Sequence, residues 1–354
     1  MNWHWAVPGP LEQATGGYHY DREVVAGLRA RGVPIAVHAL AGRHPDPDAL
    51  ARAAAARVWR RSVGSAEGLI IDGLALPAFG PLLAAEGRRG PVIALMHHPL
   101  ALETGLASAQ ARRLDAAERA ALRGVDAVVV TSPATRALLL ERGVMPAQVH
   151  VARPGAACPA RRLPLPPRRG PMNLLCVATL TPRKGHLRLL RALRGVRHPG
   201  WRLTCVGGAR DGRTTRRIQA RRDRAGWRRR VRLTGEVTPT ALSRHYRQAD
   251  LFVFASHLEG YGMALAEALA HGVPVVTTRG GAMARTVPAT AGLRVPGRPP
   301  YLRRALMHAI RRAARRRHWA AQARRHRRRL PQWDETAAVF QRLMVQTTAG
   351  VAHG

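Results

Sequence analysis

The chain of 354 residues is poor in cysteine, in aromatic residues and in acidic residues. Three cysteines without close pairs describe neither a disulfide framework nor a zinc site, and they fit a reducing compartment. Aromatic residues make up only 5% of the chain, so Ala, Leu and Val must form most of the core. No run approaches the roughly 18 apolar residues of a transmembrane helix, and the first residues do not resemble a signal peptide.

Basic residues outnumber acidic ones by 58 to 21, and Lys184 is the only lysine among them. Three interpretations of the net charge of +37 stay open. The arginine excess reflects composition alone, or it serves an anionic membrane or a phosphorylated acceptor, or it binds nucleic acid. We expect a cytoplasmic protein with no specific nucleic-acid partner, and peripheral contact with the inner face of the cell membrane as the sharper alternative.

The first half of the chain alternates short apolar runs with amphipathic segments. The runs that predict strands are Pro34–Leu40, Gly68–Asp72, Val92–His97, Ala127–Thr131 and Val149–Ala152. Helix-like stretches lie between them at Tyr18–Arg31, Ala107–Gly124 and Pro133–Arg142. Strands separated by helices of this length indicate βαβ units and a parallel, doubly wound sheet.

A segment rich in proline and arginine interrupts the pattern, which then begins again. Residues 158–171, CPARRLPLPPRRGP, suit neither a helix nor a central strand and are predicted to be a linker. The next strand candidates are Asn173–Thr179, Arg202–Val206, Val231–Thr234, Leu251–Ala255 and Val273–Thr277, with helices at Lys184–Arg194 and Gly262–His271. We therefore expect two Rossmann-like domains, residues 1–157 and 172–330.

A strongly basic region from Tyr301 to Arg329 has helical spacing and stops at Pro331. The residues predicted to share its apolar face are Leu302, Leu306, Ile310, Ala313 and Ala320. Its basic side is either an ordinary solvated face or a contact with membrane or phosphate. A final helix is predicted over Trp333–Gln346, with Asp334 as its cap.

The segment His257–Pro274, HLEGYGMALAEALAHGVP, is the most informative about chemistry. It follows a strand and turns at two glycines into a helix. Glycines let the backbone approach a ligand closely, and the N–H groups of a helix N-terminus suit a diphosphate. Glu259 precedes the helix, and Glu267 lies about one turn inside it, where a carboxylate can accept hydrogen bonds from ribose hydroxyls.

Taken together, the pattern EGYGMALAEALAxGxPVV resembles the retaining family 4 glycosyltransferases, also called glycosyl transferases group 1. The resemblance runs from Gly16 to the final helix. It implies an α/β fold of the GT-B type, in which the parallel sheets of two Rossmann-like domains face each other across a cleft. It also implies that residues 331–354 pack back on the first domain. Glu259 would lie near the donor sugar, and Glu267 would hold the ribose.

A second match, VATLTPRKG, ends at Gly185 and resembles the family's strand, loop and helix whose cations face the donor diphosphate. Lys184 matches the family's lysine. Thr179 stands where the family has an arginine, and Arg183 is a candidate to replace that charge. Loss of one such contact would weaken donor binding by about 1–3 kcal/mol.

Two elements of the first half also match. Gly16 and Gly17 resemble the family's glycine loop, which faces the donor phosphates, although a glycine pair is also a common turn. His97, with His98 as the alternate, ends a strand where the family has a histidine close to the donor sugar. Glu103, which follows in the same loop, either contacts the acceptor or has no role in the site.

The resemblance thus assigns catalytic roles to His97, Lys184 and Glu259. The residues that it assigns to the donor are Gly16, Gly17, Arg183, Lys184, Glu259, Gly260, Tyr261, Gly262, Met263 and Glu267. Because we recognise no D-x-D pair of the metal-binding kind, we expect no metal, and no cofactor besides the donor substrate. Arg285 stands where many members of the family have an acidic residue.

The resemblance implies an enzyme, a hexosyltransferase that takes a sugar from a nucleoside-diphosphate sugar with retention of configuration. The acceptor would be a hydroxyl of a glycan, a lipid-linked molecule or a small molecule. One alternative is a relative that cleaves or epimerises nucleotide sugars. The other is a non-catalytic GT-B protein that binds a nucleotide sugar or a polyanion. Thr179 and Arg285, which depart from the family pattern, favour this alternative.

Overall fold

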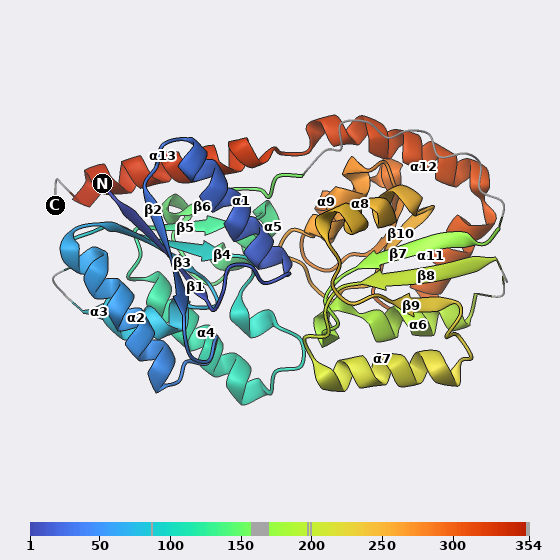
Figure 1. Cartoon of the computed structure of the whole chain (residues 1–354), viewed down its shortest axis with the longest axis horizontal. Coiled ribbons are helices and arrows are strands. Elements are labelled where there is room, and N and C mark those ends of the chain that lie inside the picture. Colours follow the sequence, from blue (N-terminus) through green and yellow to red (C-terminus); the bar gives the residue numbers. More distant parts are fainter. Residues whose placement is uncertain (86–87, 157–169, 197, 199, 352–354) are drawn as a thin grey trace. The chain divides into compact units, whose positions relative to one another are not determined.

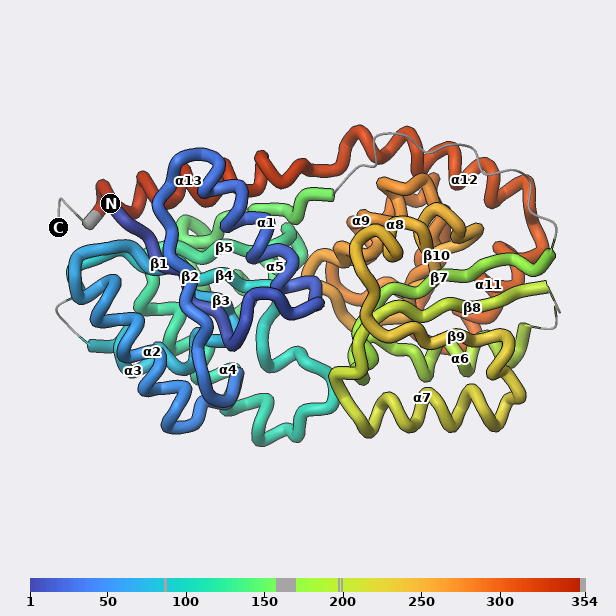
Figure 2. The backbone as a smooth tube through the Cα atoms, viewed as in Figure 1, coloured from blue at the N-terminus to red at the C-terminus, as the bar shows by residue number. Residues whose placement is uncertain are grey.

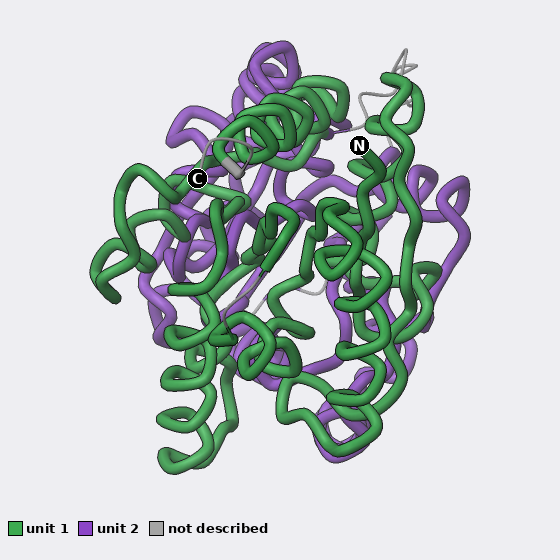
Figure 3. The backbone as a smooth tube through the Cα atoms, turned by 90° about the vertical axis from the view of Figure 1, so that its left-hand side faces the viewer, with its two compact units in different colours: residues 1–155, 331–354 green, residues 156–330 purple. Residues whose placement is uncertain are grey.

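The computed structural model describes residues 1–85, 88–156, 170–196, 198 and 200–351. The chain divides into two compact units, Met1–Gly155 with Pro331–Gly354 and Ala156–Leu330 (Figure 3). Most of the predicted linker, with Cys158, lies outside the described residues. Each unit is built on a six-stranded sheet in which all the paired strands are parallel.

The first unit contains a sheet with the strand order β2-β1-β3-β4-β5-β6. Its strands are β1 Trp3–Pro8, β2 Ile35–Leu40, β3 Gly68–Asp72, β4 Val92–Met96, β5 Ala127–Val130 and β6 Val149–Val151. Its helices are α1 Gly16–Ala30, α2 Ala49–Arg61, α3 Leu76–Ala84, α4 Ser108–Leu122, α5 Pro133–Leu140 and α13 Trp333–Val351. The five strands predicted for this half are present within one or two residues, whereas β1 is an addition.

Helices cover both faces of this sheet. Helices α2, α3 and α4 lie over one face, where their apolar residues share a core with β3, β4 and β5 (Figure 1). Helix α13 lies beside α1 on the other face (Figure 2). There the Phe340 ring packs 5.4 Å from Trp5 and 6.3 Å from Tyr20.

The start of α13 is tied to the first unit by polar contacts as well. Thr336 Oγ1 donates to the carbonyl of Arg153 at 2.7 Å, and Arg31 pairs with the Asp334 carboxylate at 2.8 Å. Because α13 begins at Trp333, Asp334 lies inside the first turn and is not its cap, so that prediction was wrong. An acidic residue in the first turn still interacts favourably with the helix dipole.

The second unit contains a sheet with the strand order β12-β11-β10-β7-β8-β9. Its strands are β7 Met172–Val177, β8 Trp201–Val206, β9 Val231–Leu233, β10 Leu251–Phe254, β11 Val275–Thr278 and β12 Gly292–Val295. Its helices are α6 His186–Arg194, α7 Gly212–Arg224, α8 Pro239–Gln248, α9 Met263–Ala270, α10 Met283–Thr286, α11 Pro299–Arg311 and α12 Ala313–His326. Cys176 on β7 and Cys205 on β8 are buried free thiols, as predicted.

The basic region near residue 312 forms two helices and not one. Arg312 has φ −108° and ψ 82°, which ends α11 and starts α12 in a new direction. Leu302, Leu306 and Ile310 are buried as expected, whereas Ala313 is exposed. The predicted single apolar face was therefore wrong beyond the break. None of the helices in the described parts of the chain combines the length and apolar character needed to cross a membrane.

The position of Phe340 generates a prediction about stability. Its side chain is 0% exposed, so Phe340→Ala should leave a cavity between α13 and β1 and cost about 3–5 kcal/mol. Val345, on the same helix, is 67% exposed, so Val345→Ala should change stability by less than about 0.5 kcal/mol. Urea unfolding followed by circular dichroism measures both. Equal losses in the two variants would show that α13 does not stabilise the unit through this contact.

Candidate functional site

Two loops of the second unit meet at the carboxyl edge of its sheet. One follows β7 and contains the short helical turn Pro182–Lys184, and the other follows β10 and contains Glu259. Lys184 Nζ lies 2.8 and 2.9 Å from the two oxygens of Glu259. The predicted catalytic pair thus forms an ion pair between segments that are 75 residues apart.

Further contacts hold the Glu259 carboxylate in place. Ser256 Oγ donates to Glu259 Oε1 at 2.6 Å, and Arg183 Nη1 lies 3.3 Å from the same oxygen. Burial would raise the pKa of Glu259, but the charges of Lys184 and Arg183 hold this pKa below its ordinary value. Glu259 is therefore ionised at neutral pH, and Arg183 contributes a second positive charge to the predicted donor site.

The loop after Glu259 leads into α9. Gly262 has φ +88° and precedes the first helical residue, Met263, without any side-chain cap. The carbonyl of Tyr261 accepts a hydrogen bond from Thr286 Oγ1. The chain from Gly260 to Met263 thus presents backbone at the amino end of a helix, where N–H groups favour an anion. Arg285, on α10, is exposed.

Glu267 lies in the second turn of α9. Its Oε2 accepts a hydrogen bond of 2.7 Å from the hydroxyl of the buried Tyr246. Burial raises the pKa of Glu267 to about 7, although the Tyr246 hydrogen bond opposes the shift. Tyr246 is itself fixed by stacking on His271 with ring centroids 4.8 Å apart.

The predicted site residues of the first unit also lie at a carboxyl strand edge. His97 directly follows β4, and Gly16 is the first residue of α1, which is capped by Thr15. The backbone of Gly17 passes over the His97 ring, because a Cβ on Gly17 would lie 3.4 Å from His97 Nε2. A Cβ at this position would make ordinary van der Waals contact with the imidazole.

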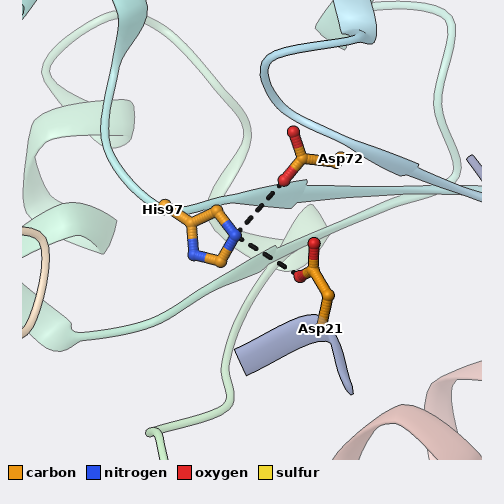
Figure 4. Close-up of side chains that lie close together, drawn as sticks. All are labelled: Asp21, Asp72 and His97. Atoms are coloured by element: carbon orange, nitrogen blue, oxygen red, sulfur yellow. Dashed lines mark ion pairs between the residues drawn. The ribbon is translucent and has the colours of Figure 1, made fainter. Parts of the chain in front are cut away.

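His97 belongs to a buried cluster with two carboxylates (Figure 4). Its Nε2 lies 3.2 Å from Asp72 Oδ2 and 3.5 Å from Asp21 Oδ1. Burial lowers the pKa of His97, but the two carboxylates together raise it to about 10. Burial raises the pKa of Asp21 to about 6, and the neighbouring Asp72 adds to this shift. The alternate, His98, instead lies 3.3 Å from Glu103.

The triplet Asp46-Pro47-Asp48 has the letters of a D-x-D pair. Asp48 Oδ1 caps α2 by accepting from the amide of Ala51 at 2.9 Å, and Asp46 pairs with Arg113 at 2.8 Å. Both carboxylates therefore have structural partners.

Four residues of these two clusters were missed from sequence. Ser256 and Tyr246 orient Glu259 and Glu267, and Asp21 and Asp72 flank His97. Asp72 carried a usable signal, because it is the last residue of a predicted strand and ligands of parallel sheets bind at that edge. Ser256 lies only three residues before Glu259 in the same loop. The contacts of Tyr246 with Glu267 and of Asp21 with His97 join separate elements, so no local spacing predicts them.

Comparison with known protein families identifies the chain. Residues 171–315 match the family described as glycosyl transferases group 1, and residues 69–155 match the glycosyl transferase 4-like domain. Together the two matches cover more than half of the chain. The chain belongs to the group 1 glycosyl transferases of family 4, as predicted.

Individual relatives agree with this assignment. Glycogen synthase of Mycobacterium tuberculosis is 31% identical over 244 residues, which is 65% of this chain and 55% of the relative. D-inositol 3-phosphate glycosyltransferase of Xylanimonas cellulosilytica is 36% identical over 151 residues, 42% of this chain and 36% of the relative. The chain thus spans about half the length, or less, of these curated relatives.

Solved structures establish the fold. Sucrose-phosphate synthase of Thermosynechococcus elongatus superposes with a TM-score of 0.82 at 23% identity, over 99% of this chain and 100% of that one. HepE of Anabaena, solved with UDP and glucose, superposes with a TM-score of 0.76 at 17% identity, over 98% of this chain and 99% of that one. The fold is of the GT-B type, with two Rossmann-like parallel sheets, as the resemblance implied.

Gly185 generates a prediction about the Lys184 loop. It has φ +69°, and a Cβ there would overlap the carbonyl oxygen of Ala255. Gly226 has nearly the same φ, +68°, with nothing within 4 Å of a Cβ. Gly226→Ala should cost about 1–2 kcal/mol for the left-handed backbone, and Gly185→Ala a further 1–3 kcal/mol for the overlap. Urea midpoints of the two variants measure the difference, and equal midpoints would contradict the close approach.

Glu267 generates a prediction about pH. Its pKa is about 7 in the folded chain against 4.5 ordinarily, so the folded state holds this proton more tightly than the unfolded state. The contribution of this group to the free energy of unfolding is therefore greatest below pH 4.5. It decreases by about 3 kcal/mol as the pH rises through 7. Glu267→Gln should remove this slope. Free energies of unfolding across this range test it, and parallel profiles for both proteins would contradict it.

Proposed function

We propose that the chain is a retaining glycosyltransferase that moves a hexose-type sugar from a nucleoside-diphosphate sugar to an acceptor hydroxyl. The observation that carries the proposal is the cluster of Lys184, Glu259 and the amino end of α9 at the carboxyl edge of one sheet. Ligands of open parallel sheets bind outside this edge. Family membership supports the reaction class, and retention of configuration rests on the resemblance.

The diphosphate would be held by charges that are already in position. The Lys184 ammonium is fixed by both oxygens of Glu259, and Arg183 lies beside the same carboxylate. The amino end of α9 at Gly262 adds backbone N–H groups, which favour an anion. Groups oriented before the reaction stabilise the charge that develops on a leaving diphosphate without reorganising. We propose no metal ion at the diphosphate, because these groups supply positive charge there.

The nucleoside would be recognised through Glu267. Tyr246 fixes one oxygen of this carboxylate, so the group is oriented before a ligand arrives. An ionised carboxylate accepts two or more hydrogen bonds, which matches the paired hydroxyls of a ribose. Because the pKa of Glu267 is about 7, ribose binding would also draw this group towards its ionised form.

We propose that the acceptor is lipid-linked or phosphorylated and that the chain acts in the cytoplasm at the membrane surface. The net charge of +37 favours an anionic partner. One relative, 33% identical over 136 residues, is a GDP-mannose-dependent phosphatidylinositol monomannoside mannosyltransferase of Mycobacterium tuberculosis. The acceptor in the name of that relative is a lipid that carries phosphate, which supports this class of acceptor.

Nucleotide binding by purified protein tests the donor site. We expect one nucleoside diphosphate from a panel to raise the melting temperature of the wild-type chain by mass action. Lys184→Ala should weaken this binding roughly 10- to 150-fold, because a hydrogen bond to a charged group contributes about 1.5–3 kcal/mol. Arg191→Ala is the matched control, since it removes an exposed positive charge from the adjoining helix α6. Transfer of the matching labelled sugar is then measured with lipid-linked and water-soluble acceptors.

Three results would contradict the proposal. Equal stabilisation of wild type and Lys184→Ala by every polyanion, with a steep salt dependence, would indicate charge attraction without a donor site. Specific binding without transfer to any acceptor would favour the non-catalytic nucleotide-sugar-binding alternative. Free sugar released at the same rate with and without acceptor would indicate a hydrolase.

A further inference from the structure

The positive charge of the chain is concentrated in one of its two units (Figure 3). The second unit, residues 156–330, contains 40 basic and 6 acidic residues, a net charge of +34. The first unit, which is about as long, contains 18 basic and 15 acidic residues, a net charge of +3. An arginine excess that reflected composition alone would be shared between both units. Composition therefore does not explain this distribution.

Within the second unit, α11 and α12 have no negative charge near them in the sequence. No acidic residue occurs between Glu267 and Asp334, whereas this stretch contains 16 arginines. Helix α7 is also rich in arginine, but Asp223 lies in its last turn and pairs with Arg222 and Arg228, each at 2.8 Å. The charge of α7 is therefore partly neutralised in place, and the charge of α11 and α12 is not.

One arginine fixes the break between α11 and α12. Arg316 Nη1 donates to the carbonyls of Ala309 and Ile310, near the end of α11, at 2.5 and 2.7 Å. The last carbonyls of a helix have no partner within the helix, so Arg316 satisfies groups that would otherwise need water. Arg316 thus has a structural role, and it holds α12 at a fixed angle to α11.

The other arginines at the break have no such role. Arg311, Arg312 and Arg315 are exposed, and their side chains have no hydrogen-bond or ion-pair partner in the parts of the chain that the structure describes. With His318 they line a hollow of about 670 Å³ at the amino end of α12. This helix end has no side-chain cap, and its backbone N–H groups favour an anion. Three guanidinium groups and a helix end thus border one hollow.

We propose that this surface binds the phosphate headgroups of an anionic membrane, with one headgroup in the hollow between α11 and α12. A guanidinium forms two parallel hydrogen bonds to a phosphate, and basic residues close to an anionic bilayer add to its binding. The cation set matches the chemistry of such a headgroup, and the uneven charge of the two units directs the second unit towards the bilayer.

The exposed side chains favour a membrane over nucleic acid. Proteins that bind single-stranded nucleic acid stack its bases on exposed aromatic rings. Among the described residues of the second unit, Tyr301 is the one exposed Phe, Trp or Tyr, and it lies in the first turn of α11, far along the helix from the hollow. The surface thus offers charge for phosphates without a platform for bases.

This inference rests on the proposed action at a membrane surface, but on no step of sugar transfer. It assigns the membrane contact to the unit that carries the proposed donor site. Helix α12 packs against α9, the helix that contains Glu267. The contact would therefore hold the donor site close to lipid-linked acceptors.

Co-sedimentation of the full chain with vesicles tests the proposal. At physiological ionic strength we expect binding to vesicles that contain phosphatidylglycerol and no binding to phosphatidylcholine alone. The combined variant Arg311→Gln, Arg312→Gln and Arg315→Gln should bind on the order of 100-fold more weakly, because each basic residue near an anionic bilayer contributes about fivefold. Melting curves establish that it is folded, and Arg315→Gln alone replaces it otherwise.

The matched control removes the same charge from another face of the same unit. It combines Arg213→Gln, Arg217→Gln and Arg224→Gln, three exposed positions of α7, which lies on the opposite side of the sheet from α12 (Figure 1). We expect it to weaken vesicle binding by less than about fivefold, because salt screens charges that lie more than about 10 Å from the bilayer.

Several outcomes would overturn the proposal. Equal losses in the two combined variants would show that net charge decides binding and not this surface. Tighter binding to duplex DNA than to anionic vesicles would identify a nucleic-acid partner instead. Complete release from vesicles by inorganic phosphate, at the phosphate concentration of the lipid, would show that the free anion suffices.

Nucleotide binding separates this inference from the proposed function. A nucleoside diphosphate that raises the melting temperature of wild type should raise that of the α12 variant equally, because the hollow is not part of the donor site. Nucleotide binding by a wild-type chain that ignores anionic vesicles would overturn this inference and leave the proposed transferase intact.

Discussion

A carboxylate buried at the edge of a sheet needs cations held against it, and this constraint shapes the second unit around Glu259. Removing an unpaired carboxylate from water costs several kcal/mol or more. Lys184, Arg183 and Ser256 meet that requirement together, and each reaches Glu259 from a different point of two loops. The loops can supply these groups only if their backbones approach closely. Glycine at position 185, where a Cβ would overlap the carbonyl of Ala255, allows this approach.

The first unit also contains a buried charged cluster, but there the negative groups outnumber the positive one. There two carboxylates, Asp21 and Asp72, converge on one imidazole, so that positive charge is in short supply and not in excess. Both clusters lie where parallel strands end, because all strands of such a sheet present their carboxyl ends, and the loops that follow, at one edge. The two glycines differ, because a Cβ on Gly17 would make ordinary contact with His97 at 3.4 Å, whereas a Cβ on Gly185 would overlap the carbonyl oxygen of Ala255. The close approach of the loops therefore requires glycine in the second unit.

Much of this could be predicted from sequence where the signal is local. The buried strands are continuous apolar runs, and the spacing between Glu259 and Glu267 was enough to identify the family. Helix α7 was missed because it buries only Thr214 and Ile218 among many arginines and so shows little apolar periodicity. The break at Arg312 was missed because neither proline nor glycine marks it. The contacts of Asp21 with His97 depend on the packing of α1 against the sheet, which no spacing along the chain encodes.

The same physical view explains why position 184 carries the chain's only lysine. A guanidinium is a broad planar fork that stacks and forms parallel pairs of bonds, whereas an ammonium is a compact point charge with three donors. At this position one nitrogen reaches both oxygens of Glu259, at 2.8 and 2.9 Å, and also lies 5.7 Å from the centre of the Phe254 ring. A group this compact can reach both oxygens of the carboxylate from a single atom. Arg183, one residue earlier, uses its larger fork differently, with one nitrogen bonded to the carbonyl of Leu258. The arginine therefore braces the loop and also supplies a second positive charge beside that of the lysine.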